Sequence, residues 1–351
     1  MKTTKCLKRI ILSASLILSV WLFWPSMAPQ QVQSNKSVKQ VLPVKTGNVI
    51  NTTKNLIPAV EIAPKHISSN ASAKLIASAY AAELNFPPYS QPLSGNDFDR
   101  LQPNYFNPQS VPIDDKGGML KASLSKYRYT YPEPIVASLS GDNLVNAKLE
   151  LINLSNGKVV SNTNFYQENG QWRATLQGKE NLPQPLQALI NTQINGKQVT
   201  IALALKYVDS IATLTGFEPA MSDGADMVVS ANISTREKGL YRLRANLFDA
   251  NNQPIAHLVA KERLGEGSKQ LRVKAHHSVL IGKQAPFYLS TFSIELMSPA
   301  PGKPKKYGNS AIKKYVINDF ETSSLSEVPY QPSDNEQQRL NLLQQMASGG
   351  S

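Results

Sequence analysis

The sequence predicts a mainly β protein built from two tandem β-sandwich domains. Three observations lead to this prediction. Apolar residues recur at every second position between residues 119 and 300, and turn signals separate these alternating stretches. The pattern also repeats at an offset of roughly 95 residues, the size of one sandwich domain. A chain of 351 residues has room for two or three ordinary domains.

The first domain is expected over residues 119–208. Its clearest alternating stretches are Val145–Leu151, Trp172–Leu176 and Val199–Tyr207. Each stretch presents one apolar and one polar face, as a strand does when one side of its sheet is buried. Asn-Gly pairs tolerate the positive φ angles of tight hairpins and therefore predict turns. The three pairs are Asn156-Gly157, Asn169-Gly170 and Asn195-Gly196.

The second domain is expected over residues 209–300. Its alternating stretches are Met227–Ile233, Tyr241–Leu247, Leu271–Ala275 and Phe287–Met297. A turn is expected at Asp249–Asn252. Residues 148–160 of the first domain read much like residues 242–255 of the second, which indicates an internal duplication.

This rhythm of strands and turns, present twice, resembles the tandem immunoglobulin-like or fibronectin-like domains of exported bacterial proteins. The resemblance covers residues 119–300, about half of the chain. It implies immunoglobulin-like β-sandwiches and a spacer, adhesive or complex-forming role. The Cys…Trp…Cys pattern of antibody domains is absent, because Trp172 has no flanking cysteines and Cys6 is the single cysteine. The resemblance therefore transfers no functional residue.

Residues 1–28 are predicted to be a signal peptide or membrane anchor. Four basic residues precede an uncharged apolar run that starts at Ile10, so the amino end should stay in the cytoplasm. Ser26-Met27-Ala28 has a spacing that a signal peptidase accepts, but Pro29 disfavours the cut. The run is also long enough to span a bilayer. We favour an anchor on the periplasmic side of the cytoplasmic membrane; a cleaved, secreted form is the alternative.

Residues 29–84 are predicted to be a flexible stalk that ends in a short helix over Ser72–Leu84, because polar residues dominate its first part. Residues 85–118 combine six prolines with five aromatic residues. We expect an extended arm laid across the first domain, which would bury these aromatics. The alternative is a segment presented to a partner.

Residues 301–351 are expected to form a basic loop, an edge strand over Tyr315–Phe320 and a helix over Asn335–Met346. The lysines of Pro299–Lys306 indicate an exposed loop, with an anion site as the alternative. Leu340 and Leu343 share one stripe of the helix, which suits packing or contact with a partner.

The formal charge of +12 does not indicate nucleic-acid binding. Residues 1–85 hold ten Lys and Arg against two Glu, a net +8, so the remaining 266 residues carry only +4. The basic excess therefore belongs to the export segment and stalk, and not to a folded face.

No signature of catalysis, a cofactor or a metal site stands out. His257, His276 and His277 are expected at the surface, and adjacent histidines on a strand point to opposite faces. Loop aspartates, among them Asp223 and Asp226, allow a calcium site only as a minor alternative, since no EF-hand spacing occurs.

We therefore expect a non-enzymatic cell-envelope protein, structural or protein-binding, whose partner is another envelope protein. The alternative is a carbohydrate-binding or adhesive module, or an accessory domain of a polysaccharide-active system, with Tyr127, Tyr129 and Tyr131 as candidate glycan contacts. Hydrolase activity is a third alternative. The predicted partner or ligand contacts are Phe86, Tyr89, Tyr127, Tyr129, Leu340 and Leu343.

Overall fold

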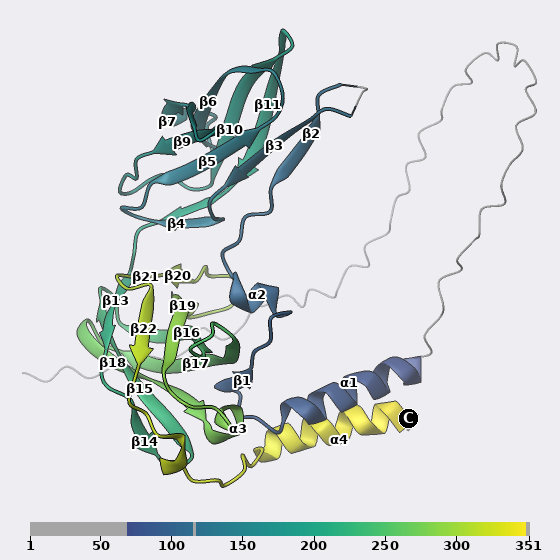
Figure 1. The fold of residues 1–351 in the computed structure, drawn as a ribbon, viewed down its shortest axis with the longest axis vertical. Coiled ribbons are helices and arrows are strands. Elements are labelled where there is room, and N and C mark those ends of the chain that lie inside the picture. Colours follow the sequence, from purple (N-terminus) through teal and green to yellow (C-terminus); the bar gives the residue numbers. More distant parts are fainter. Residues whose placement is uncertain (1–68, 115–116, 349–351) are drawn as a thin grey trace, which may run out of the picture. The chain divides into compact units, whose positions relative to one another are not determined.

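The computed structural model describes residues 69–114 and 117–348 (Figure 1). The predicted signal or anchor segment and the stalk up to residue 68 lie outside this range. The described chain is mainly β, with its strands arranged in five sheets. Within these residues, no helix is both long enough and apolar enough to cross a membrane.

A first β region contains two larger sheets, with strand orders β2-β3-β5-β9-β8 and β11-β10-β6-β7, and a short parallel pair of β4 with β12. The strands are β2 (Gln109–Pro112), β3 (Met119–Leu124), β4 (Arg128–Thr130), β5 (Ile135–Ser140), β6 (Leu144–Asn153), β7 (Val159–Asn164), β8 (Tyr166–Glu168), β9 (Gln171–Leu176), β10 (Leu186–Ile194), β11 (Lys197–Ala204) and β12 (Lys206–Val208). All pairings in the two larger sheets are antiparallel.

Both of these sheets contribute to one hydrophobic core, which we call the first core. Leu149 on β6 and Ile190 on β10 meet Leu139 on β5 and Leu176 on β9 in this cluster. Alternate residues of β5 and β10 are buried, as the period of two requires. The apolar stripes read from the sequence therefore face inward, except for Val145 at the start of β6, which is 68% exposed.

Two of the three Asn-Gly pairs form the predicted tight hairpins. Asn169-Gly170 joins β8 to β9 and Asn195-Gly196 joins β10 to β11, with all four residues at positive φ. Such two-residue loops match the right-handed twist of paired strands. At Asn156-Gly157 only the glycine has a positive φ, and the longer connection from β6 to β7 closes with a hydrogen bond from Gly157 N to Asn153 O.

A second β region contains a sheet of order β1-β17-β16-β19-β20, in which β22 also pairs with β19, and a sheet of order β14-β15-β13-β21, in which β18 also pairs with β15. Its elements are β1 (Ser90–Pro92), β13 (Ala212–Phe217), β14 (Met221–Asp223), β15 (Asp226–Thr235), β16 (Gly239–Phe248), β17 (Pro254–Leu264), β18 (Gly267–His276), α3 (His277–Leu280), β19 (Phe287–Leu296), β20 (Lys306–Tyr307), β21 (Asn309–Ser310), β22 (Lys314–Ile317) and the 3-10 turn η1 (Thr322–Ser324).

The second core lies between these two sheets. It includes Leu243 and Leu247 from β16 and Val229 and Ile233 from β15. Phe320, which follows β22, also packs into it. The predicted edge strand near Tyr315 is therefore present as β22, which continues the sheet beside β19.

The two segments that look alike in sequence occupy equivalent positions in their sheets. In the first region β6 pairs with β7 on one side and β10 on the other. In the second region β16 pairs with β17 on one side and β19 on the other. Each segment is thus a central strand followed by its hairpin partner.

The proline-rich arm differs from its prediction. Its first half lies on the second β region, not the first: β1 pairs with β17, and Leu93 N donates to Ile255 O at 3.0 Å. Only its second half joins the first region, where Phe106 is buried in the first core and β2 pairs with β3. Between them lies α2 (Phe98–Leu101), a single turn. The edge of β17 offers unpaired backbone groups, and β1 satisfies them.

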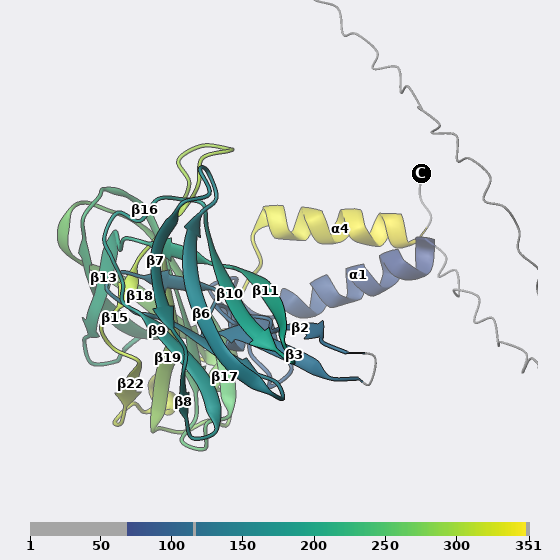
Figure 2. The ribbon, with the colours of Figure 1, turned by 90° about the horizontal axis from the view of Figure 1, so that it is seen from above.

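Helices α1 (Ser69–Glu83) and α4 (Asp334–Ser348) pack side by side (Figures 1 and 2). Ala77 and Ala347 are buried. The start of α4 is set by Ser333, whose backbone N–H and hydroxyl both donate to the Glu336 carboxylate at 2.8 and 2.7 Å. This is the N-terminal capping arrangement that the sequence Ser-x-x-Glu favours.

Candidate functional site

The most polar concave surface of the first β region lies where β6, β10 and β11 present their outward side chains. The strand register aligns Asn146 with Gln193 and Gln193 with Gln198, so three neighbouring strands form a row of amides. A second row has Lys148 at its centre, paired with Asn164 on β7 and with Asn191 on β10. We call this surface the amide groove.

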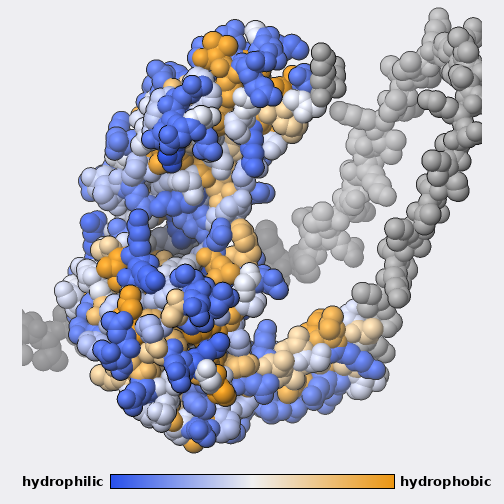
Figure 3. Space-filling view, viewed as in Figure 1, coloured by the Kyte–Doolittle hydropathy of each residue, from blue (hydrophilic) through white to orange (hydrophobic). Residues whose placement is uncertain are grey.

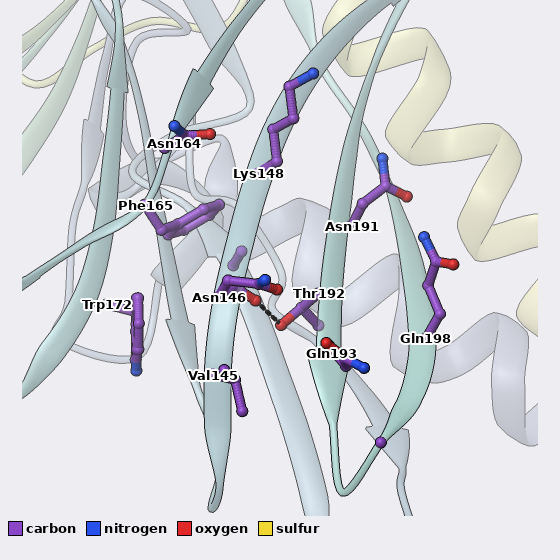
Figure 4. A pocket seen from close by; sticks show the side chains of 12 residues that line it. Val145, Asn146, Lys148, Asn164, Phe165, Trp172, Asn191, Thr192, Gln193 and Gln198 are labelled. Carbon is purple, nitrogen blue, oxygen red and sulfur yellow. Dashed lines mark hydrogen bonds between the residues drawn. The ribbon is translucent and has the colours of Figure 1, made fainter.

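Two aromatic residues also line the groove, beside strand β6 (Figure 4). Trp172 comes from β9 in the opposite sheet, is half-buried, and packs against the first core. Phe165, between β7 and β8, is buried beside it, and its N–H donates to Ala147 O at 2.9 Å. The groove has a volume of about 810 Å³.

Hydrogen bonds fix part of the groove and leave part of it free. Thr192 Oγ1 donates to Asn146 O at 2.6 Å, close to the irregularity in the β6–β10 pairing at Gln193. Asn191 Nδ2 donates to Glu150 at 3.1 Å. In the described part of the chain, four other amide side chains that line the groove make no hydrogen bond to protein: Asn146, Asn164, Gln193 and Gln198.

These free amides give the groove a definite chemistry. Each can donate and accept hydrogen bonds at once, which is what a ligand rich in hydroxyl groups requires. The face or edge of an aromatic ring adds apolar contact for the C–H groups of such a ligand. None of the twelve described residues that line the groove is Asp or Glu, so it contains no carboxylate pair for glycoside cleavage.

The six predicted contact residues lie in separate places. Phe86 and Tyr89 belong to the arm on the second β region, and Leu340 and Leu343 are half-buried on α4. Tyr127 is 44% exposed before β4. Tyr129 is fully buried, and its hydroxyl donates to Val136 O at 3.2 Å. Tyr129 is therefore a core residue and not a surface contact.

The tyrosines considered as glycan contacts do not form a platform. Tyr129 is buried in the first core, and Tyr131 packs partly against the same core. Burial raises the pKa of the Tyr129 hydroxyl, and that effect outweighs the hydrogen bonds that it shares with Ser125 and its neighbours. Only Tyr127 of the three is strongly exposed.

The histidine prediction was wrong for His276, which is only 5% exposed. His276 ends β18 and caps α3: Nδ1 accepts the Ser278 N–H at 3.2 Å and lies 2.9 Å from Ser278 Oγ. The contact between His276 and Ser278 resembles a serine–histidine pair, but the same Nδ1 already accepts the backbone N–H. It is a local helix cap. His257 lies on β17 and is half-buried.

The two aspartates weighed as calcium ligands are both paired with cations. Asp223 contacts Arg272 at 2.5 Å, and Asp226 contacts Lys274 at 2.9 Å. Asp226 also accepts the Tyr89 hydroxyl. These carboxylates therefore serve ion pairs and arm docking.

Sequence reasoning missed the amide groove, although part of its signal was visible. The polar partners of each alternating strand, such as Asn146 and Lys148, marked the outward face. The sequence did not show which strands become neighbours, so the alignment of Asn146 with Gln193 could not be predicted.

The fold and the groove together define a mainly β protein of several sheets with a polar, amide-lined recess. No protein-family model matches the chain, and no curated protein matches it. Among solved structures, a DUF4785 family protein from Legionella pneumophila is similar at 18% identity and a TM-score of 0.38, over 50% of this chain and 52% of that one. The chain thus spans about half the length of that protein. The IG1+IG2 domain pair of DIP-gamma aligns at 10% identity and a TM-score of 0.20, over 61% of this chain and 99% of that pair.

Proposed function

We propose that this chain is a non-enzymatic binding protein of the bacterial cell envelope that holds neutral glycan chains in the amide groove. Asn146, Gln193 and Gln198 carry the proposal, because these three amides stand in one row without protein partners in a recess that Trp172 also lines. A neutral sugar matches such a surface better than an ion does, since the amides carry no charge.

The architecture in this proposal is a pair of immunoglobulin-like β-sandwiches in tandem. The separate first and second cores and the equivalent positions of β6 and β16 support it. The proposal places these domains outside the cytoplasmic membrane, attached through residues 10–28. Cell fractionation with amino-terminal sequencing tests this: a soluble periplasmic form cut after Ala28 would replace the anchor with a signal peptide.

Calorimetric titration of the full chain with neutral oligosaccharides tests the glycan site. The probes are hexasaccharides of glucose, xylose and N-acetylglucosamine. We expect the double variant Asn164→Ala, Gln193→Ala to bind at least tenfold more weakly, because each lost hydrogen bond contributes about 1 kcal/mol. Trp172 fluorescence should change on binding, and Trp172→Phe should remove that change.

A matched control separates the groove from the surface in general. Asn162→Ala, Gln167→Ala removes the same two amide types from β7 and β8, at exposed positions outside the groove. This variant should bind like the parent. Equal losses in both double variants, or no binding of any probe at millimolar concentration, would refute the proposal.

A protein partner is the second candidate function, and the pair of helices favours it. Leu75 is 71% exposed and Ile76 is 55% exposed on α1, and α4 exposes Leu342 and Met346. Figure 3 shows the apolar surface along α1. Site-specific photo-crosslinking from position 76 in cells should capture one envelope protein, with Lys158 as the control position; equal labelling from both positions would count against it.

A further inference from the structure

A second cavity lies where the arm crosses the sheet of β16, β17 and β19, and Arg128 of β4 also lines it. It has a volume of about 390 Å³. Arg100 of α2, Arg244 of β16, His257 of β17 and Thr291 of β19 line it together with Lys305, which precedes β20. We call it the basic pocket.

An irregularity in the sheet shapes the basic pocket. Arg244 pairs with Ser293 and Asn246 pairs with Ser290, so one residue of β16 faces two residues of β19. The extra residue is Thr291, at φ 58°. A β-branched residue rarely adopts this left-handed conformation, and such bulges and strained residues are frequent beside binding sites.

The charges that line the pocket are unbalanced. Its lining holds four basic side chains and two carboxylates, a net charge of +2: Arg100, Arg128, Arg244 and Lys305 against Asp99 and Glu295. Glu295 is already engaged by Arg242, by Arg244 at 3.0 Å and by Lys305 at 3.4 Å. Among the described residues, neither Arg100 nor Arg128 forms an ion pair; Arg128 instead lies 3.9 Å from the centre of the Tyr307 ring.

Hydrogen bonds define the state of the histidine in the pocket. Asn246 Nδ2 donates to Arg100 O at 2.7 Å, which leaves its Oδ1 to face His257 Nδ1 at 2.7 Å. Because this oxygen only accepts, Nδ1 carries the ring proton. Burial, followed by the charges of Arg100 and Arg244, lowers the pKa of His257 to about 4. The ring is therefore neutral at pH 7, and Nε2 is an acceptor.

We infer that the basic pocket binds a small organic anion through its carboxylate or phosphate group, with Arg100 and Arg128 as the principal cationic contacts. Guanidinium groups match both oxyanions in shape and charge. Thr291, Ser293 and Tyr307, which carry hydroxyl groups, also line the pocket and suit a hydroxylated ligand such as an acidic sugar.

The test uses the full chain and three probes: galacturonate, inorganic phosphate and uncharged galactose. We expect calorimetry to detect galacturonate or phosphate and no galactose at this site, and the two anions distinguish a carboxylate ligand from a phosphate one. Arg100→Gln should weaken anion binding at least tenfold. Arg100 is exposed, so the unliganded melting temperature should stay unchanged.

Arg263→Gln is the matched control, because Arg263 is an exposed arginine on β17 outside the pocket. It should leave anion binding unchanged. Anion binding should also survive Asn164→Ala, Gln193→Ala, so failure of the glycan proposal and failure of this one can be distinguished. Absence of binding by both anions at 10 mM, or equal binding by the Arg100 and Arg263 variants, would overturn the inference.

Discussion

The hydroxyl of Tyr89 donates a 2.8 Å hydrogen bond to Asp226 Oδ1 and so joins the amino-terminal arm to strand β15. The other carboxylate oxygen of Asp226 accepts from Lys274 at 2.9 Å. One residue further, the buried Ser90 hydroxyl accepts the His276 N–H at 3.0 Å. Burial and the hydrogen bond to Asp226 raise the pKa of Tyr89, so the phenol stays protonated and able to donate.

Replacing Tyr89 by Phe should therefore loosen the arm. We expect the free energy of unfolding to fall by about 1.5 kcal/mol, because a nearly buried carboxylate loses one of its donors. Amide hydrogen exchange should speed up at Val259, whose N–H donates to Tyr89 O. Urea unfolding and exchange measurements check both effects. Tyr127→Phe, at an exposed tyrosine, should change stability by less than about 0.5 kcal/mol; equal behaviour of the two variants would contradict the docking role.

Glu295 should be the most sensitive carboxylate of the second β region. It is 4% exposed and accepts from three cations, and these interactions outweigh its burial and hold its pKa below the usual value. Glu295→Gln leaves Arg242 and Arg244 without a counter-charge and should cost about 3 kcal/mol in chemical denaturation.

The matched control is Glu168→Gln. Glu168 pairs with Arg173 at 2.7 Å, but both side chains are exposed. Solvent screens this pair, so the loss should stay below about 1 kcal/mol. Similar losses at Glu168 and Glu295 would show that burial does not set the difference.

Thr291 should be replaceable with a gain in stability. Asn tolerates the left-handed conformation that Thr291 adopts, so Thr291→Asn should raise the free energy of unfolding by about 1 kcal/mol. Thr175→Asn, on β9 with ordinary strand geometry, should lower it instead, because Asn is a poor strand former. Thermal melts of the two variants are the measurement; shifts of the same sign would contradict a strained Thr291.

His257 should make stability depend on pH. Its pKa is about 4 in the folded protein against about 6.5 in the unfolded chain, so the unfolded state binds more protons between these values. Its contribution is complete above pH 6.5 and is lost as the pH falls toward 4. After allowance for screening at this half-buried site, we expect a loss on the order of 1 kcal/mol.

Urea unfolding at intervals between pH 4 and pH 7 checks this effect. Carboxylates also titrate near the lower limit, so the difference between the parent and His257→Asn is the quantity to compare. That difference should shrink as the pH falls. A difference that stays constant over the interval would show that His257 has an ordinary pKa.

Much of the fold was predictable because it depends on local periodicity. The alternation of Val145–Leu151 predicted β6, and Asn169-Gly170 and Asn195-Gly196 predicted two hairpins, since both signals act within a few residues. The helix over Asn335–Met346 was predicted for the same reason, and Ser333 and Glu336 set its start.

Contacts between distant segments were not predictable. The arm joined β17 because β17 had an open edge, and nothing near Ser90 in the sequence records that edge. Tyr129 and His276 were misjudged for a related reason: their burial depends on what packs over them from elsewhere in the chain.

The sequence by itself determined which residues face inward and where the chain turns, because backbone geometry fixes side-chain direction from one residue to the next. Only the tertiary structure decided which outward residues became neighbours. Asn146 and Gln193 meet through the register of β6 with β10, and the docked arm brings Arg100 to Asn246, the hydrogen-bond partner of His257. Both sites arise from pairings across long stretches of chain, whose free energy no local pattern contains.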